Sequence, residues 1–127
     1  MNKKILTTAF ILGMISIILG AFGAHALKKV LTPEHLASFE TGVRYQMYHA
    51  LFLLFLANAN FITDKKKNLV YLLVLIGVIL FSGSIYLLTT KDITSIDISA
   101  IAFITPIGGL FLILAWLLSL MAVLSRK

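Results

Sequence analysis

Four long apolar runs, separated by short polar segments, dominate the pattern of the chain. They cover residues 5–27, 45–62, 69–88 and 98–124. Each run holds at least 18 residues. At about 1.5 Å per residue even the shortest run rises about 27 Å as a helix, close to the roughly 30 Å hydrocarbon core of a bilayer. The pattern therefore predicts an all-α fold, a four-helix transmembrane bundle, formed as one integral membrane domain by residues 1–127.

The first run has a second interpretation. A basic start at Lys3 and Lys4, an apolar middle and the sequence Ala24-His25-Ala26 are also typical of a secretory signal peptide with a small-x-small cleavage site. However, the apolar stretch is longer than the roughly 7 to 15 residues usual in such peptides. We therefore expect the segment to be retained as the first membrane span.

The segment between the first two runs, Lys28 to Arg44, is polar enough to lie at the interface, and it predicts an interfacial helix from Thr32 to Arg44 at the extracytoplasmic surface. Thr32 can cap this helix, and Pro33 suits its first position because the missing N–H would be unpaired there. One apolar face then repeats at steps of three and four residues: Leu36, Phe39, Val43, Met47, Ala50 and Leu54. The face continues into the second run, so the pattern predicts one long helix or two helices joined near Gly42.

Small residues form strips along three of the predicted helices. These are Gly13, Ser16, Gly20 and Gly23 in the first run, Gly77 and Ser84 in the third, and Ala102, Pro106 and Gly109 in the fourth. Such strips let helix backbones approach closely in lipid. We expect them to pack inside the monomer; an oligomer interface or a ligand groove is the alternative. Pro106 also predicts a kink within the fourth helix.

Composition and charge support a membrane protein. Of 127 residues, 60% are hydrophobic and 13% are charged, whereas about a quarter are charged in ordinary globular proteins. The net charge is +6, but the basic residues lie between the apolar runs and so indicate orientation rather than nucleic-acid binding. One side would hold Lys3, Lys4, Lys65, Lys66, Lys67, Arg126 and Lys127, and the other Lys28, Lys29, Arg44 and Lys91. The positive-inside rule therefore predicts that both termini face the cytoplasm.

The candidate chemistry gathers around the start of the second run. Its members are His25, Glu40, Arg44, Tyr45, Gln46 and His49. Ionisable groups at membrane depth are costly and normally face the protein interior or water. We expect His49 to point into the bundle and Glu40 to pair with Arg44, four residues away. Because His25 ends the first span on the same membrane side, we also expect the two imidazoles to come together.

Three interpretations of this polar cluster stay open. The first is a structural hydrogen-bond network; the second is a site for a lipid, an anion, a metal or haem; the third is a catalytic site with Glu40 and a histidine as acid and base. The histidines at 25, 35 and 49 share no helix face, and the chain has no cysteine. We therefore predict no metal site, no cofactor and no catalytic residues.

Four ordered motifs resemble one known family. They are Gly20-Ala21-Phe22-Gly23-Ala24-His25-Ala26-Leu27, Phe39-Glu40-Thr41-Gly42-Val43-Arg44-Tyr45-Gln46-Met47-Tyr48-His49-Ala50, Phe81-Ser82-Gly83-Ser84-Ile85-Tyr86 and Thr105-Pro106-Ile107-Gly108-Gly109. In this order the chain resembles the small bacterial membrane proteins known as domain of unknown function 423, or uncharacterised protein family 0382, whose eukaryotic relatives are called transmembrane protein 256. The resemblance covers essentially the whole chain. It implies a four-helix protein of the bacterial inner membrane and no particular reaction.

These observations favour a non-enzymatic membrane protein that acts as a structural, assembly or membrane-organising subunit. The alternative is a small binding or transport module for a lipid, ion or cofactor at His25, Arg44 and His49. The expected partners are the lipid bilayer and, through the small-residue strips, a second copy of the chain or another membrane protein. We expect no nucleic-acid partner.

Overall fold

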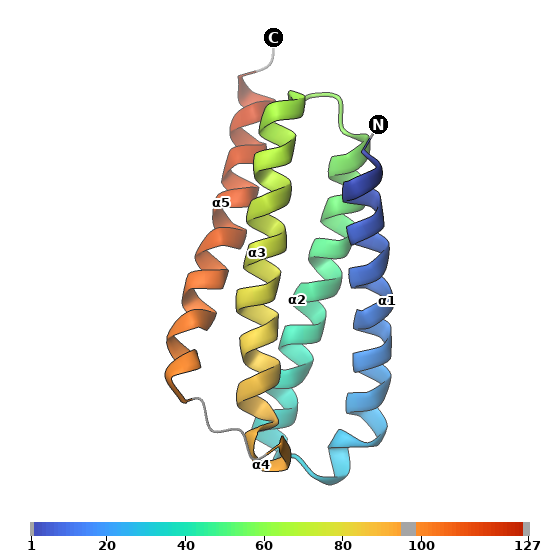
Figure 1. The fold of residues 1–127 in the computed structure, drawn as a ribbon, viewed down its shortest axis with the longest axis vertical. Helices are drawn as coiled ribbons and strands as arrows, with labels where there is room; N and C mark the ends of the chain where they lie inside the picture. The colour runs from blue at the N-terminus through green and yellow to red at the C-terminus, as the bar shows by residue number, and fades with distance from the viewer. Residues whose placement is uncertain (1, 95–98, 126–127) are drawn as a thin grey trace.

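The computed structural model describes residues 2–94 and 99–125, and every regular element in that part of the chain is helical. The four long helices are α1 (Lys3–His25), α2 (Pro33–Asn58), α3 (Asp64–Thr89) and α5 (Ile104–Leu124). Three short pieces lie between them: η1 (Leu27–Lys29), α4 (Lys91–Thr94) and η2 (Ser99–Phe103). Figure 1 shows the long helices along one common direction, with both chain ends at the same end of the molecule. The all-α prediction is confirmed.

Threonine caps begin two of the long helices. The Thr32 hydroxyl oxygen accepts a hydrogen bond from the His35 N–H at 3.1 Å, and Pro33 holds the first helical position, as predicted. At the start of α3, Thr63 accepts from the Lys66 N–H at 3.3 Å. Each cap satisfies one of the N–H groups that a helix start leaves without an intrahelical partner. Local sequence therefore determines where α2 and α3 begin.

The helices pack as two hairpins joined through their inner members. α1 packs on α2, α3 packs on α5, and α2 contacts α3 (Figure 1). The main core includes Leu53 and Leu56 of α2 and Val70 and Val74 of α3, all fully buried. A smaller cluster around Phe39 closes the opposite end of the bundle. The α2–α3 pair is therefore the centre of the molecule.

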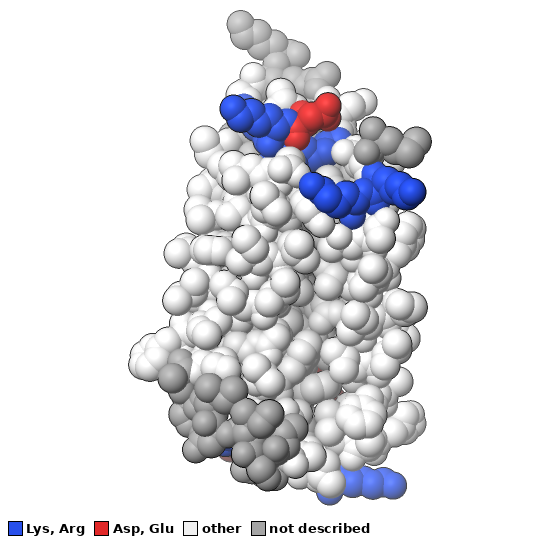
Figure 2. Space-filling view, in the orientation of Figure 1, with Lys and Arg blue, Asp and Glu red and all other residues white. Residues whose placement is uncertain are grey.

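The outer surface is apolar along most of its length. Phe10 and Ile17 of α1 are 64% and 67% exposed, and many large apolar side chains of α5 are exposed as well. On the face drawn in Figure 2, charged side chains gather toward the two ends. Three helical segments are long and apolar enough to cross a membrane: Lys3–Lys29, Asp64–Thr89 and Ile101–Leu124. This surface is suited to lipid rather than to water.

The second helix differs from the predicted boundaries at its end. α2 is continuous from Pro33 to Asn58, with no break at Gly42, but the predicted run to residue 62 is wrong because the helix ends at Asn58. Ala59 is extended, and its carbonyl accepts a hydrogen bond from the Lys67 ammonium at 2.7 Å. That carbonyl therefore has its partner outside α2, and the apolar residues after it belong to the connecting loop.

The last helix also starts later than predicted. Residue 98, the expected start, lies outside the described residues, and α5 begins at Ile104 after the short η2 turn. Pro106 therefore stands in the first turn of α5 rather than in its interior. A proline there removes no helical hydrogen bond, because the first N–H groups of a helix have no intrahelical acceptor. The prediction of a kink inside the helix is wrong for this reason.

Candidate functional site

Gln46 joins three helices from the middle of α2. Its side chain is only 4% exposed. The amide nitrogen donates to the Leu12 carbonyl of α1 at 3.0 Å, and the amide oxygen accepts from the Tyr86 hydroxyl of α3 at 2.7 Å. The buried Ser16 hydroxyl donates to the same Leu12 carbonyl at 2.8 Å. Both ends of the Gln46 amide are therefore bound within the chain.

Close approach of α2 and α3 places Tyr86 within reach of Gln46. A Cβ atom added to Gly42 would lie 2.9 Å from Cε1 of Tyr86, so only a residue without a side chain leaves room for this ring. The Tyr86 ring also packs against Phe39, with centroids 5.1 Å apart. One turn before Tyr86, the Ser82 hydroxyl donates to the Gly42 carbonyl at 2.7 Å. Two hydrogen bonds therefore join α2 and α3 near Gly42.

His49 is buried between α2 and α5 and binds through both ring nitrogens. Its Nδ1 lies 2.7 Å from the Tyr45 carbonyl, and its Nε2 lies 3.1 Å from Nε1 of Trp116. An indole N–H can only donate, so Nε2 must be the acceptor, and Nδ1 carries the proton that it donates to Tyr45. His49 is therefore a neutral imidazole of one defined tautomer. The prediction that it points into the bundle is confirmed.

Two predicted members of the cluster, Glu40 and Arg44, lie on the surface instead. The Arg44 guanidinium donates to the Thr41 hydroxyl of its own helix at 3.1 Å. Within the described part of the chain no ion pair joins Arg44 to Glu40, so the predicted pair is wrong. Both are exposed, and a nearby hydroxyl on the same helix satisfies one guanidinium donor. They line a shallow 220 Å³ cavity on the surface between α1 and α2.

His25 and His49 do not come together. α1 and α2 run side by side so that Gly13 lies beside Ala50, whereas Gly23 lies beside Phe39. His25 is therefore level with the start of α2 and His49 with the middle of α1, about 15 Å or more apart along the bundle. The expected imidazole pair is wrong because α2 is one continuous helix, which carries His49 far from the end where His25 is exposed.

Tyr45 takes part in the site mainly through its backbone. Its carbonyl binds His49, while its ring is 40% exposed and packs on Phe81 with centroids 5.1 Å apart. The ring also contacts Tyr48 of its own helix at 5.5 Å between centroids. Of the six predicted residues, the structure thus buries Gln46 and His49 on one face of α2, with the Tyr45 carbonyl beside His49.

The small residues of α1 and α3 lie against neighbouring helices of the same chain, whereas Ala102 and Pro106 of the third strip are exposed. Gly13, Gly20 and Gly23 each lie against α2, facing Ala50, Val43 and Phe39 respectively. A Cβ atom added to Gly77 would lie 2.7 Å from the Leu112 side chain. One added to Gly109 would lie 3.6 Å from the Phe81 ring. The hydroxyls of Ser84 and Thr105 are hydrogen-bonded to one another between α3 and α5.

Several residues of the site escaped the sequence analysis. Gly108 is the tightest contact of α5, because an added Cβ would collide with the backbone at Phe81. Ser82 and Tyr86 lie within a family motif, but nothing in the sequence indicates what they bind. Trp116 is half exposed, yet its N–H binds His49. A tryptophan N–H in apolar surroundings usually has a hydrogen-bond partner, and this rule alone could have pointed to a partner for Trp116.

The buried polar groups of the site already have hydrogen-bond partners within the described part of the chain. Among the described residues, no buried side-chain nitrogen or oxygen lacks a hydrogen-bond partner. The same residues contain no group of three or more His, Cys, Asp or Glu side chains able to hold a metal ion. The polar side-chain groups of Gln46, His49 and Tyr86 already have hydrogen-bond partners within the chain. The chemistry that this geometry supports is the joining of α1, α2, α3 and α5.

Comparisons with known proteins agree with the motifs. A family model described as "Protein of unknown function (DUF423)" matches residues 19–109, which include all four motifs. A UPF0382 membrane protein of Staphylococcus haemolyticus is 39% identical over 105 residues, covering 83% of this chain and 82% of that protein. The UPF0382 inner membrane protein YgdD of Escherichia coli is 33% identical over 130 residues, covering 99% and 93%. No solved structure matches the chain.

Proposed function

The chain belongs to the DUF423 family of membrane proteins, and from this premise we propose that it is a non-enzymatic, four-span protein of the bacterial inner membrane. In this proposal it acts through its own packing, as a small structural, assembly or membrane-organising subunit. The observation that carries the proposal is the saturated polar cluster of Gln46, His49, Ser82 and Tyr86, which links helices and leaves no buried polar atom free among the described residues.

The path of α2 supports its being a fourth span, although its charges keep its mean hydropathy low. At one end of α1 the Asn2 amide donates to the Ala57 carbonyl at 2.5 Å, and near the other end Gly23 lies against Phe39. α2 therefore accompanies α1 along nearly its whole length. A membrane crossed by α1 would be crossed by α2 as well. Arg44 follows Val43, which lies beside Gly20 near the end of α1, so its long side chain can reach the interface.

The distribution of basic residues supports an orientation with both termini in the cytoplasm. An even number of spans places both ends of the chain on one side, as in Figure 1. The end with the termini and the α2–α3 connection carries most of the described lysines: Lys3, Lys4, Lys65, Lys66 and Lys67. In this orientation the first turns of α2 would lie in the opposite, extracytoplasmic interface, as a continuation of the span rather than a separate helix.

Cysteine labelling at the two ends of α2 tests this topology. The chain contains no cysteine, so single substitutions Val30→Cys and Lys65→Cys give clean reporters. We expect an impermeant maleimide to label Val30→Cys in intact spheroplasts, and Lys65→Cys only after the membrane is opened. If both positions react on the same side, α2 does not cross the membrane and the four-span proposal is wrong.

Two substitutions in α2 test the structural role of the polar cluster. His49→Ala removes the bond to Trp116 and should lower the stability of the detergent-solubilised protein by about 1 kcal/mol, since interhelical hydrogen bonds in membrane proteins contribute about 0.6 to 1.7 kcal/mol. Arg44→Ala is the matched control and should change stability by less than about 0.5 kcal/mol, because Arg44 binds only its own helix. Thermal unfolding measures both, and native mass spectrometry detects any ligand.

The result that contradicts the proposal is equally specific. If His49→Ala leaves stability unchanged but abolishes a co-purifying metal, haem or other ligand, the cluster is a binding site. A binding function at His49, without His25 and Arg44, would then replace the structural one.

A further inference from the structure

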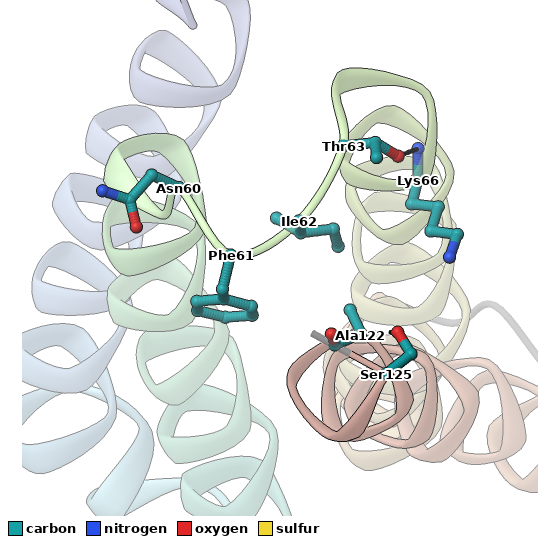
Figure 3. A pocket seen from close by; sticks show the side chains of 7 residues that line it. All are labelled: Asn60, Phe61, Ile62, Thr63, Lys66, Ala122 and Ser125. Atoms are coloured by element: carbon teal, nitrogen blue, oxygen red, sulfur yellow. Dashed lines mark hydrogen bonds between the residues drawn. The ribbon is translucent and has the colours of Figure 1, made fainter. Parts of the chain in front are cut away.

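A cavity of 330 Å³ lies beneath the loop that connects α2 to α3, at the end of the molecule that carries the termini. Figure 3 shows its walls: Asn60, Phe61, Ile62 and Thr63 from the loop, Lys66 from the first turn of α3, and Ala122 and Ser125 from the end of α5. The Lys66 chain and Ser125 lie on one side, and the Phe61 ring on the other. One cavity thus combines a cation, hydroxyl groups and an aromatic ring.

Lys66 differs from Lys67 and Lys4 because, among the described residues, its ammonium has no partner. The Lys67 ammonium is buried against the Ala59 carbonyl at 2.7 Å, and Lys4 donates to the Asn68 side chain at 3.2 Å. Among the described residues the Lys66 ammonium has no hydrogen-bond or ion-pair partner, and it lines the cavity. Lys65, also exposed, is not part of that wall.

The hydroxyl groups of the cavity add donors for an anion. The Thr63 oxygen accepts the Lys66 backbone N–H, so its own hydrogen stays available to donate. The Ser125 hydroxyl makes a long bond of 3.2 Å to the Ala122 carbonyl and can turn toward a stronger acceptor. Together with the ammonium of Lys66 these groups suit the oxygens of a phosphate.

An apolar groove borders this cavity at Phe61 and extends along the side of the bundle. The groove has a volume of 560 Å³, runs between α2 and α5, and shares Phe61 with the cavity. Phe52, Phe55 and Trp116 form its aromatic part, and Val123 of α5 lines it as well. Polar groups therefore lie at the end of the bundle and apolar groups along its side. This order matches the headgroup and the acyl chain of a lipid.

We propose that the cavity and the groove together bind one anionic phospholipid. The phosphate binds Lys66, Thr63 and Ser125, and an acyl chain lies in the groove against Phe55 and Trp116. In the orientation of the proposed function, on which this inference rests, the lysine-rich end faces the cytoplasmic leaflet, and its positive field attracts the anionic lipids there. A free phosphate would use the cavity but gain nothing from the groove, so the position of the two side by side at Phe61 favours a lipid.

Native mass spectrometry of the full-length protein, released from nanodiscs of phosphatidylglycerol and phosphatidylcholine in equal amounts, tests the proposal. We expect the wild type to retain phosphatidylglycerol in preference to phosphatidylcholine. Lys66→Gln should lower that retention about fivefold, the effect of one lysine near a membrane surface. Lys65→Gln removes the same charge one residue away and should change retention less than about twofold, while Lys66→Arg should keep it.

A second pair of variants tests the groove. Val123→Trp places a large ring in the groove and should lower lipid retention severalfold, whereas Leu124→Trp, at a position 73% exposed and outside the groove wall, should not. Thermal unfolding of all five variants shows that each is folded. Glycerol 3-phosphate at millimolar concentration should leave the bound lipid in place.

Three results overturn the proposal. Equal losses for Lys66→Gln and Lys65→Gln would show that general surface charge attracts the lipid. Displacement by glycerol 3-phosphate, with no effect of Val123→Trp, would show an anion site without an acyl groove. A lipid-free dimer that Val123→Trp dissociates would show that a second copy of the chain occupies the groove.

Discussion

The two faces of α3 are joined to their neighbours by different means. On the α2 side, hydrogen bonds from Ser82 and Tyr86 reach the Gly42 carbonyl and the Gln46 amide. On the α5 side, one side-chain hydrogen bond joins Ser84 and Thr105, and the rest of the contact depends on glycines: Gly77 lies against Leu112, and Gly108 lies directly on the backbone of α3 at Phe81. Side-chain hydrogen bonds to α2 therefore dominate one interface, and close approach of the backbones dominates the other.

The comparison shows two solutions to one physical problem. Lipid is as apolar as the helices, so burying apolar side chains gives little drive for helices to associate, and close van der Waals contact or interhelical hydrogen bonds must supply it. The α2–α3 interface should therefore be sensitive to loss of polar atoms. The α3–α5 interface should be sensitive to the addition of a single methyl group.

The largest effect is expected at Gly108. In Gly108→Ala the new Cβ would collide with backbone atoms of Leu80 and Phe81, which cannot turn aside as a side chain can. Overpacking of this kind costs about 1 to 3 kcal/mol, and we expect the upper part of that range for the unfolding free energy in detergent. Gly109→Ala is the control, because its Cβ would make an ordinary contact at 3.6 Å. Equal effects of the two would mean that α5 does not approach α3 as described.

A smaller effect is expected at Gln46. Gln46→Leu keeps much of the side-chain volume but leaves the Tyr86 hydroxyl without its acceptor, so we expect a loss of about 1 to 2 kcal/mol. Adding Tyr86→Phe removes the orphaned hydroxyl, and the double variant should lose less than the sum of the two single variants. Chemical denaturation of all three measures the coupling. Strict additivity would show that the bond contributes nothing to the α2–α3 interface.

The smallest effect is expected at Ser82. Ser82→Ala removes one hydroxyl bond to the Gly42 carbonyl, which still accepts within its own helix, so we expect a loss of about 0.6 kcal/mol. Gly83→Ala, the neighbouring position, adds a methyl group into open space and should leave stability unchanged or slightly raised. If Gly83→Ala lowers the unfolding free energy more than Ser82→Ala does, hydrogen bonding does not hold the α2–α3 interface.

The sequence predicted which side chains of the site face inward, but not which residues they bind. Helical spacing placed Gln46 and His49 on the inner face of α2, and that part of the prediction is confirmed, because the face of a side chain depends only on its position in the helix. Their partners could not be derived in the same way. Leu12, Tyr86 and Trp116 lie 34, 40 and 67 residues away in the chain, and many apolar positions have the same spacing.

By itself, the sequence determined the helical class, the membrane environment, the start of α2 at Thr32 and the use of small residues for packing. Each of these depends on neighbours within a few turns, where hydrophobic run length and capping chemistry act directly. Only the tertiary structure decided that α2 continues unbroken past Arg44, that His49 binds Trp116 rather than His25, and that Gly108 sets the distance between α3 and α5. These depend on the alignment of whole helices, where a shift of one turn, about 5.4 Å, exchanges every partner.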